Sequence, residues 1–158
     1  MNKIAKLIFS ATFLCAASAS ANSLPGNAGH SYFPSEATCF YQPSWAGIAN
    51  NCTGKKSWVV PLQNTLTAAG TITVKATGNG SCVQGQLCLE VTPKCTAYQV
   101  RYNGGLVVQK TATLTAIAGL ATTIGTFTNV QPTDTLHLAC EMPGTNEVGN
   151  RGLMSVSW

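Results

Sequence analysis

The sequence is built of short runs in which apolar and polar residues alternate. Residues 71–76 read Thr-Ile-Thr-Val-Lys-Ala, and a Gly-Asn-Gly turn follows at 78–80. An alternation of period two puts the apolar side chains on one face of a β-strand and the polar ones on the other. The same pattern recurs at 86–92, 96–102 and 136–140. Runs of this kind favour antiparallel sheets that each bury one face.

Further runs predict strands at residues 58–62, 106–108, 124–130 and 153–158. Asn103-Gly104-Gly105 predicts a tight hairpin turn before one of them. At 111–121 Leu114 and Ile117 have helical spacing, but the density of threonine and the presence of Gly119 favour a strand and turn. We therefore predict a strand there as well.

The alternation also predicts which side chains share a face. In the run 96–102 the apolar face is expected to carry Tyr98, Val100 and Tyr102. In the last run the shared face is expected to carry Met154, Val156 and Trp158.

About seven to nine short strands at regular spacing, without a convincing helix, predict an all-β antiparallel sandwich. Residues 130–138 read Val-Gln-Pro-Thr-Asp-Thr-Leu-His-Leu. This stretch resembles the turn and following strand of immunoglobulin-like and fibronectin-like sandwiches, which implies an architecture but no function. The strands are expected over residues 58–158, and a loop-rich segment with many Pro and Gly residues over 22–57. Residues 22–158 together have the length of one domain.

The N-terminus has the features of a secretory signal peptide. Lys3 and Lys6 make a positive start, an apolar stretch follows at 7–17, and Ala19-Ser20-Ala21 offers small residues for cleavage. We predict a bacterial signal peptide over residues 1–21 with cleavage after Ala21, and a secreted or periplasmic protein. No later apolar stretch reaches the roughly 20 residues of a transmembrane helix.

An even number of cysteines remains after this cleavage: Cys39, Cys52, Cys82, Cys88, Cys95 and Cys140. In an exported chain this predicts disulfides. We expect Cys39 to pair with Cys52 across a local loop. Cys140 is expected to pair with one of Cys82, Cys88 and Cys95. No two cysteines have the close spacing of a zinc site, so no metal is expected.

Charged residues are scarce, with nine Lys or Arg and five Asp or Glu in the whole chain. Lys55-Lys56 is the only adjacent basic pair, which argues against nucleic-acid binding. The carboxylates and the two histidines are scattered, and no nucleophile elbow, metalloprotease helix or phosphate loop occurs. The sequence therefore predicts neither an enzyme nor a cofactor.

His137 lies between Leu136 and Leu138, so it is expected to face outward, near Asp134. We interpret it as a surface histidine with a local hydrogen bond. The alternative is a copper site of His137, Cys140 and Met142, since cupredoxins are exported β-sandwiches. Their ligands follow the order Cys, His, Met, which differs from the order here, and Cys140 is needed for an even number of bridged cysteines.

Aromatic residues give the positive indication of function. Six of the ten beyond residue 21 lie in one segment: Tyr32, Phe33, Phe40, Tyr41, Trp45 and Trp58. Aromatic faces anchor binding surfaces. The predicted binding residues are Tyr32, Tyr41, Trp45 and Trp58, and the alternative is that these rings supply core.

The function expected from these features is a non-enzymatic binding module for a glycan or a cell-surface protein. Two alternatives remain open. One is a structural subunit of an extracellular fibre or coat that assembles through edge strands, because few charges protect the sheet edges. The other is a secreted inhibitor of a hydrolase, because a disulfide-held loop is organised in advance for insertion into a cleft.

Overall fold

The computed structural model describes residues 22–43, 47–80, 91–117, 119–146 and 152–158. Trp45, Cys82, Cys88 and most of the strand predicted at 86–92 lie outside these residues. Within them the chain forms eleven strands and one 3-10 helix: β1 (Ser23–Pro25), β2 (His30–Ser31), η1 (Pro34–Cys39), β3 (Phe40–Tyr41), β4 (Ile48–Asn50), β5 (Lys56–Leu62), β6 (Gly70–Gly78), β7 (Lys94–Val100), β8 (Leu106–Thr113), β9 (Ala121–Val130), β10 (Thr135–Met142) and β11 (Gly152–Ser157).

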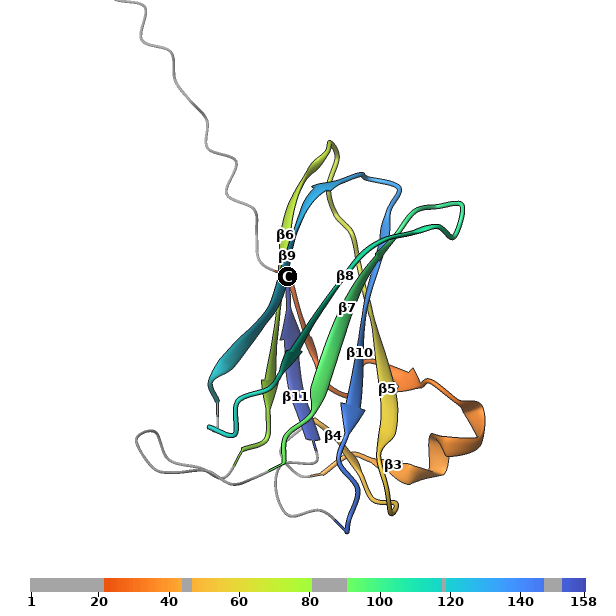
Figure 1. The fold of residues 1–158 in the computed structure, drawn as a ribbon, viewed down its shortest axis with the longest axis vertical. Coiled ribbons are helices and arrows are strands. Elements are labelled where there is room, and N and C mark those ends of the chain that lie inside the picture. The colour runs from red at the N-terminus through yellow and green to blue at the C-terminus, as the bar shows by residue number, and fades with distance from the viewer. Residues whose placement is uncertain (1–21, 44–46, 81–90, 118, 147–151) are drawn as a thin grey trace, which may run out of the picture.

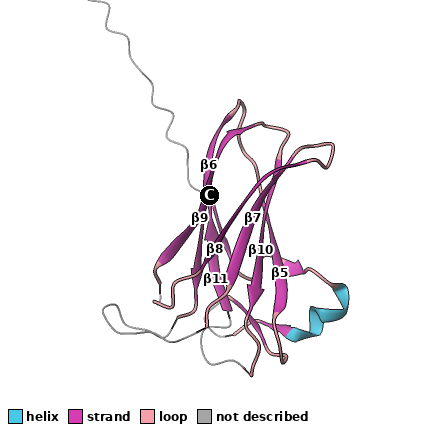
Figure 2. Ribbon diagram, in the orientation of Figure 1, coloured by secondary structure: helices cyan, strands magenta, loops and turns pink. Residues whose placement is uncertain are grey.

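The strands form two antiparallel sheets that pack as two layers (Figure 1). The first sheet has the order β3-β4-β11-β6-β9, and β1 also pairs with β11. The second sheet has the order β2-β5-β10-β7-β8. Strands dominate, and η1 lies at the side of the sandwich next to β5 (Figure 2). The predicted all-β antiparallel sandwich is therefore confirmed.

The core lies between the sheets and follows the predicted alternation. Val60 of β5 and Leu138 of β10 point inward from the second sheet, and both are fully buried. Val74 of β6, Phe127 of β9 and Val156 of β11 meet them from the first sheet. Burying each such side chain stabilises the fold by roughly 1.5–3 kcal/mol.

The segment 22–57 holds more regular structure than its Pro and Gly content predicts. Leu24 of β1 pairs with Val156, and His30 of β2 pairs with Val59. The short β4 pairs with the start of β11. Strands of two or three residues are too short to show an alternating pattern, which is why the observed number exceeds the predicted seven to nine.

Two disulfides join residues that the sequence had marked for pairing. Cys39 at the end of η1 is bound to Cys52, as predicted. Cys140 is bound to Cys95, one of its three predicted partners. These two cysteines are directly opposite each other on β10 and β7 and are fully buried.

The strand predicted at 111–121 is wrong as a single element. β8 ends at Thr113, β9 begins at Ala121, and a turn lies between them. Gly119 takes a left-handed φ of 73° in that turn, a conformation that favours glycine. The backbone N–H of Thr115 donates to Thr122 Oγ1. This side chain replaces the partner that a neighbouring strand would supply in a ladder.

The predicted face of the run 96–102 is also wrong. Cys95, Ala97 and Gln99 of β7 are buried, so Tyr98 faces outward. The disulfide of Cys95 to Cys140 holds this face inward. Gln99 Nε2 adds a buried hydrogen bond of 2.7 Å to Asp134 Oδ2.

The last strand departs from strict alternation because its register shifts. The ladder between β11 and β6 has an irregularity between Leu153 and Ser155. An extra residue in one strand lets residues on either side of it share a face. Leu153 and Val156 are therefore both fully buried, while Met154 is half-buried.

Candidate ligand-binding groove

The outer face of the second sheet is formed by side chains that alternate with the core. On β10 this face carries His137, Ala139 and Glu141, because the residues between them fill the interior. The strand is central in its sheet, so each outward residue has a neighbour on both sides. His137 is opposite Tyr98 of β7, and Ala139 is opposite Thr96.

A groove of about 500 Å³ lies on this face. Small-molecule sites commonly have volumes of about 300–1,000 Å³ and combine apolar walls with a few polar groups. Both kinds of side chain occur here. The groove is lined by His30, Tyr32, Phe33, Ser57, Val59, Tyr98, His137 and Ala139.

The floor of the groove contains a pair of stacked rings. The rings of Tyr98 and His137 have centroids 4.8 Å apart and planes inclined by 17°. Opposite residues of an antiparallel pair lie close enough for such contacts. Burial lowers the pKa of His137 below its ordinary value of 6.5, because the charged imidazolium loses hydration. Burial therefore favours the neutral form of His137.

One wall of the groove is made by Tyr32 and Phe33, which follow β2. Tyr32 is 60% exposed and Phe33 is 51% exposed. Their rings pack edge to face, with centroids 4.8 Å apart. The backbone N–H of Tyr32 donates to the carbonyl of Ser57, and the hydroxyl of Ser31 donates to the carbonyl of Phe33. The first hydrogen bond joins the wall to β5, and the second fixes the backbone that follows β2.

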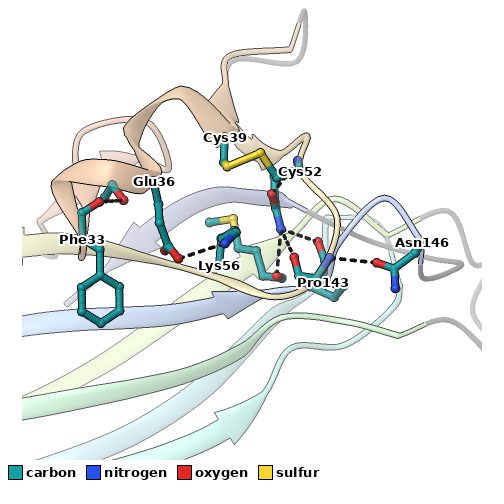
Figure 3. The surroundings of a disulfide bond; sticks show 11 residues. Phe33, Glu36, Cys39, Cys52, Lys56, Pro143 and Asn146 are labelled. Carbon is teal, nitrogen blue, oxygen red and sulfur yellow. Dashed lines mark hydrogen bonds and ion pairs between the residues drawn. A yellow bond between two sulfur atoms is a disulfide. The ribbon is translucent and has the colours of Figure 1, made fainter.

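The helix η1 follows this wall directly in the chain, and two contacts hold it in place (Figure 3). Cys39 at its end is bound to Cys52. Glu36 forms an ion pair of 2.9 Å with Lys56 at the start of β5. Both side chains of the pair are largely shielded from solvent. These contacts hold the segment that carries Phe33 against the edge of the second sheet.

A smaller hollow of about 250 Å³ adjoins the groove on the same face. It shares Ser57, Tyr98 and Ala139 with the groove. Its other lining residues are Lys94, Thr96 and Glu141. Glu141 forms an ion pair of 3.1 Å with Lys55.

The binding residues predicted from the sequence do not gather in one place. Tyr32 lines the groove. Tyr41 is exposed but belongs to β3 of the first sheet. Trp58 is only 8% exposed, packs against Phe40 and donates from Nε1 to the carbonyl of Gly26, so it serves as core. Trp45 lies outside the described residues.

Tyr98 and His137 are two of the groove residues that the sequence did not predict as binding residues. The outward direction predicted for His137 is correct, but that residue was interpreted as an ordinary surface histidine. Tyr98 was expected on the apolar face of its strand. No local pattern marked Tyr98, because its outward position follows from the pairing of β7 with β10 and from the disulfide of Cys95 and Cys140.

The residues considered for copper do not converge. Cys140 is bound to Cys95, and Met142 is fully buried. Both belong to the inward face of β10, whereas His137 lies on the outward face. In the part of the chain that the structure describes, no three His, Cys, Asp or Glu side chains come together as metal ligands would.

The carboxylates of the described residues already have partners. Glu36 and Glu141 are paired with lysines. Asp134 is buried and accepts hydrogen bonds from Gln99 Nε2 and the backbone N–H of Gln131. The prediction that Asp134 lies near the outward-facing His137 is therefore wrong, because Asp134 is buried on the other side of the sheet.

Within the described residues no helix has the length and apolar character to cross a bilayer.

Comparison with known proteins gives similarities of fold alone. No protein-family model and no curated protein matches the sequence. A family two carbohydrate esterase from Cellvibrio japonicus has 8% identity and a TM-score of 0.48, over 87% of this chain and 33% of the esterase chain. TmCBM61, solved in complex with beta-1,4-galactotriose, has 11% identity and a TM-score of 0.43, over 89% of this chain and 88% of its own.

A third similar structure is a cycloisomaltooligosaccharide glucanotransferase from Paenibacillus sp., complexed with cycloisomaltoheptaose. It has 8% identity and a TM-score of 0.43, over 86% of this chain. This chain spans 33% of the esterase and 18% of the glucanotransferase.

Proposed function

We propose that the protein is an exported, non-enzymatic binding module that holds a glycan in the groove of the second sheet. The observation that carries this proposal is the stacked pair of Tyr98 and His137 on the groove floor, with Tyr32 and Phe33 exposed beside it. The two disulfides support export, because such bonds persist in oxidising compartments. Residues 1–21 would supply the leader.

The chemistry of the lining suits a sugar ring. Each face of a pyranose presents C–H groups, and the negative face of an aromatic ring attracts the positive ends of these bonds. The hydroxyl groups around the sugar ring need hydrogen-bond partners. The hydroxyl of Ser57 and the imidazole nitrogens of His30 lie in the same groove and offer both donors and acceptors.

The groove is also prepared for binding before a ligand arrives. Tyr98 and His137 are half-buried in a register that the adjacent ladder maintains. The wall is anchored by the hydroxyl of Ser31 and by the disulfide of Cys39 and Cys52. Little conformational freedom remains to be lost, which favours affinity for a small ligand.

A small ligand suits this site better than a protein partner does. Stable protein interfaces bury about 800 Å² on each partner. The concave, aromatic part of this face is confined to one groove with a volume of about 500 Å³. A mono- or oligosaccharide fits within that volume, whereas a protein would touch it with a single side chain or loop.

The test is a glycan array followed by calorimetry with the best ligand. The intact exported protein is compared with Tyr98→Ala, which removes half of the stacked pair. We expect at least about a ten-fold loss of affinity, because stacked rings dominate such contacts. Tyr102→Ala is the matched control, since Tyr102 is 81% exposed and does not line the groove.

Two results would overturn the proposal. One is an array in which the intact protein binds no glycan. The other is an affinity that survives in Tyr98→Ala while near-ultraviolet circular dichroism shows a native fold. A loss in Tyr102→Ala equal to that in Tyr98→Ala would place the binding surface elsewhere.

A further inference from the structure

The two hollows of the second sheet adjoin each other, and together they are called the cleft. They share Ser57, Tyr98 and Ala139 among their lining residues. Along β10 the cleft extends from His137 to Glu141, which at about 3.4 Å per residue is roughly 14 Å. This length exceeds a single sugar ring. A ligand that fills the cleft is therefore a chain of at least two sugar units.

The charge along this cleft is uneven. The larger hollow has no Lys, Arg, Asp or Glu among its lining residues. The smaller hollow has two charged residues, Lys94 and Glu141, which lie opposite each other on β7 and β10. The carboxylate of Glu141 is within 3.1 Å of Lys55 Nζ. Its negative charge is thus already balanced.

Lys94 differs from the other lysines of this region. Lys55 and Lys56 each form an ion pair with a glutamate. Within the described residues Lys94 has no ion pair, and its side chain is exposed on the cleft. At one end the cleft therefore presents a lysine that forms no ion pair, opposite a glutamate that is already paired with Lys55, and at the other end it presents the stacked rings.

We propose that the ligand is an acidic oligosaccharide whose uronic acid carboxylate binds Lys94. This inference rests on the proposed glycan-binding function of the groove. One sugar unit stacks on Tyr98 and His137, and a following unit lies over Ala139. The carboxylate of that unit accepts a charge-assisted hydrogen bond from Lys94 Nζ. Lys94 is thus the specificity-determining residue, and the stacked rings supply affinity.

The expected preference is modest, because Lys94 is exposed and water screens its charge. An exposed ion pair typically changes an affinity by up to about five-fold. The preference is expected to shrink as salt is raised, since the Debye length falls from about 10 Å at 0.1 M to about 3 Å at 1 M. The stacking contribution involves no net charge, so salt should change it little.

The experiment is calorimetry with paired probes at low and high salt. The probes are oligosaccharides of polygalacturonate, alginate and glucuronoxylan, each beside the same chain after reduction of its carboxyl groups. The proteins are the intact chain, Lys94→Gln, Tyr98→Ala and Lys75→Gln. Lys75 is an exposed lysine of β6 in the first sheet and serves as the matched control.

The expected result is that the intact protein prefers at least one acidic chain over its reduced partner by about five-fold at low salt. Lys94→Gln should abolish this preference and keep the affinity for the reduced chain. Lys75→Gln should keep both, and Tyr98→Ala should weaken both.

The opposing results separate the two proposals. If reduced and acidic chains bind equally well and Tyr98→Ala weakens both, the acidic preference is wrong and the glycan-binding function stands. If Lys94→Gln keeps the full preference, Lys94 is not the residue that determines it, and the glycan-binding function again stands. If no acidic, reduced or arrayed glycan binds the intact protein, the proposed function itself fails.

Discussion

The ring of Tyr98 lies stacked on the ring of His137, with 4.8 Å between their centroids. The two residues are direct partners on β7 and β10, three residue pairs along the same ladder from the buried disulfide of Cys95 and Cys140. A shift of one residue in strand register would turn a side chain to the other face of its sheet. The pairing that builds the core therefore also builds the floor of the groove.

Replacement of Tyr32 and of Tyr41 distinguishes the groove from the other exposed aromatic surface. Tyr32 lines the groove, while Tyr41 is exposed on the first sheet. We expect Tyr32→Ala to weaken glycan binding about ten-fold, because an aromatic anchor is lost. We expect Tyr41→Ala to bind as the intact protein does. Calorimetry with one glycan measures both, and the reverse order of effects would move the site to the first sheet.

His137 makes the stability of the protein depend on pH. Its folded-state pKa lies below 6.5, so the folded protein binds fewer protons than the unfolded chain in acid. The corresponding stability is complete above pH 6.5 and is lost as the pH falls from there through the folded-state pKa. We expect the melting temperature to fall over this range. The fall should be smaller in His137→Gln, because glutamine does not titrate.

Calorimetric melting of both proteins from neutral to acidic pH makes the comparison. Other titrating groups affect both proteins alike, so the difference between the two curves reports His137. Parallel curves throughout this range would show that burial of His137 has no influence on acid stability.

The buried contact between Gln99 and Asp134 is expected to be a main polar support of the core. Gln99 Nε2 donates to Asp134 Oδ2 at 2.7 Å, and Gln99 Oε1 has no partner among the described residues. Asp134→Ala leaves the Gln99 amide buried without its acceptor, which should cost about 2–3 kcal/mol. Thr133→Ala, at an exposed position of the same turn, should change stability by less than about 0.5 kcal/mol. Urea unfolding measures both, and equal values would contradict this role.

The disulfide of Cys39 and Cys52 is expected to support binding as well as stability. The pair closes a loop with a sequence separation of 13 residues. Its removal by Cys39→Ala with Cys52→Ala should lower stability by about 3 kcal/mol. It should also weaken glycan binding several-fold, because the wall that carries Tyr32 and Phe33 loses an anchor.

Ile124→Ala is the control for this second effect. Ile124 is buried on β9 of the first sheet and does not line the groove, and the variant is expected to destabilise the fold by about 2–5 kcal/mol. Calorimetry well below both melting temperatures should show nearly unchanged affinity for this variant. If both variants bind equally well, the disulfide has no part in shaping the groove.

The fold was predictable where the residue pattern of one segment is unambiguous. Along β10 the inward residues are Leu136, Leu138 and Cys140, and the residues between them are polar or small. Such a strand shows its buried face in its own sequence. The same reasoning predicted that His137 faces outward, and the structure agrees.

The site was less predictable because its strands have ambiguous faces. On β7 the outward Tyr98 is more apolar in appearance than the inward Gln99, so local hydropathy indicates the wrong face. In the aromatic segment, composition alone could not separate Trp58 from Tyr32. The pairing of β2 with β5 places Ser31 opposite Trp58, and the chain leaves the sheet immediately afterward with Tyr32 exposed.

The sequence by itself determined an antiparallel sandwich and the bridge between Cys39 and Cys52, because alternation and the closure of a short loop are properties of neighbouring residues. Only the tertiary structure decided that Tyr98 and His137 face outward together. The reason is that a strand with mixed faces takes the orientation that its partners impose, and those partners lie far away in the chain.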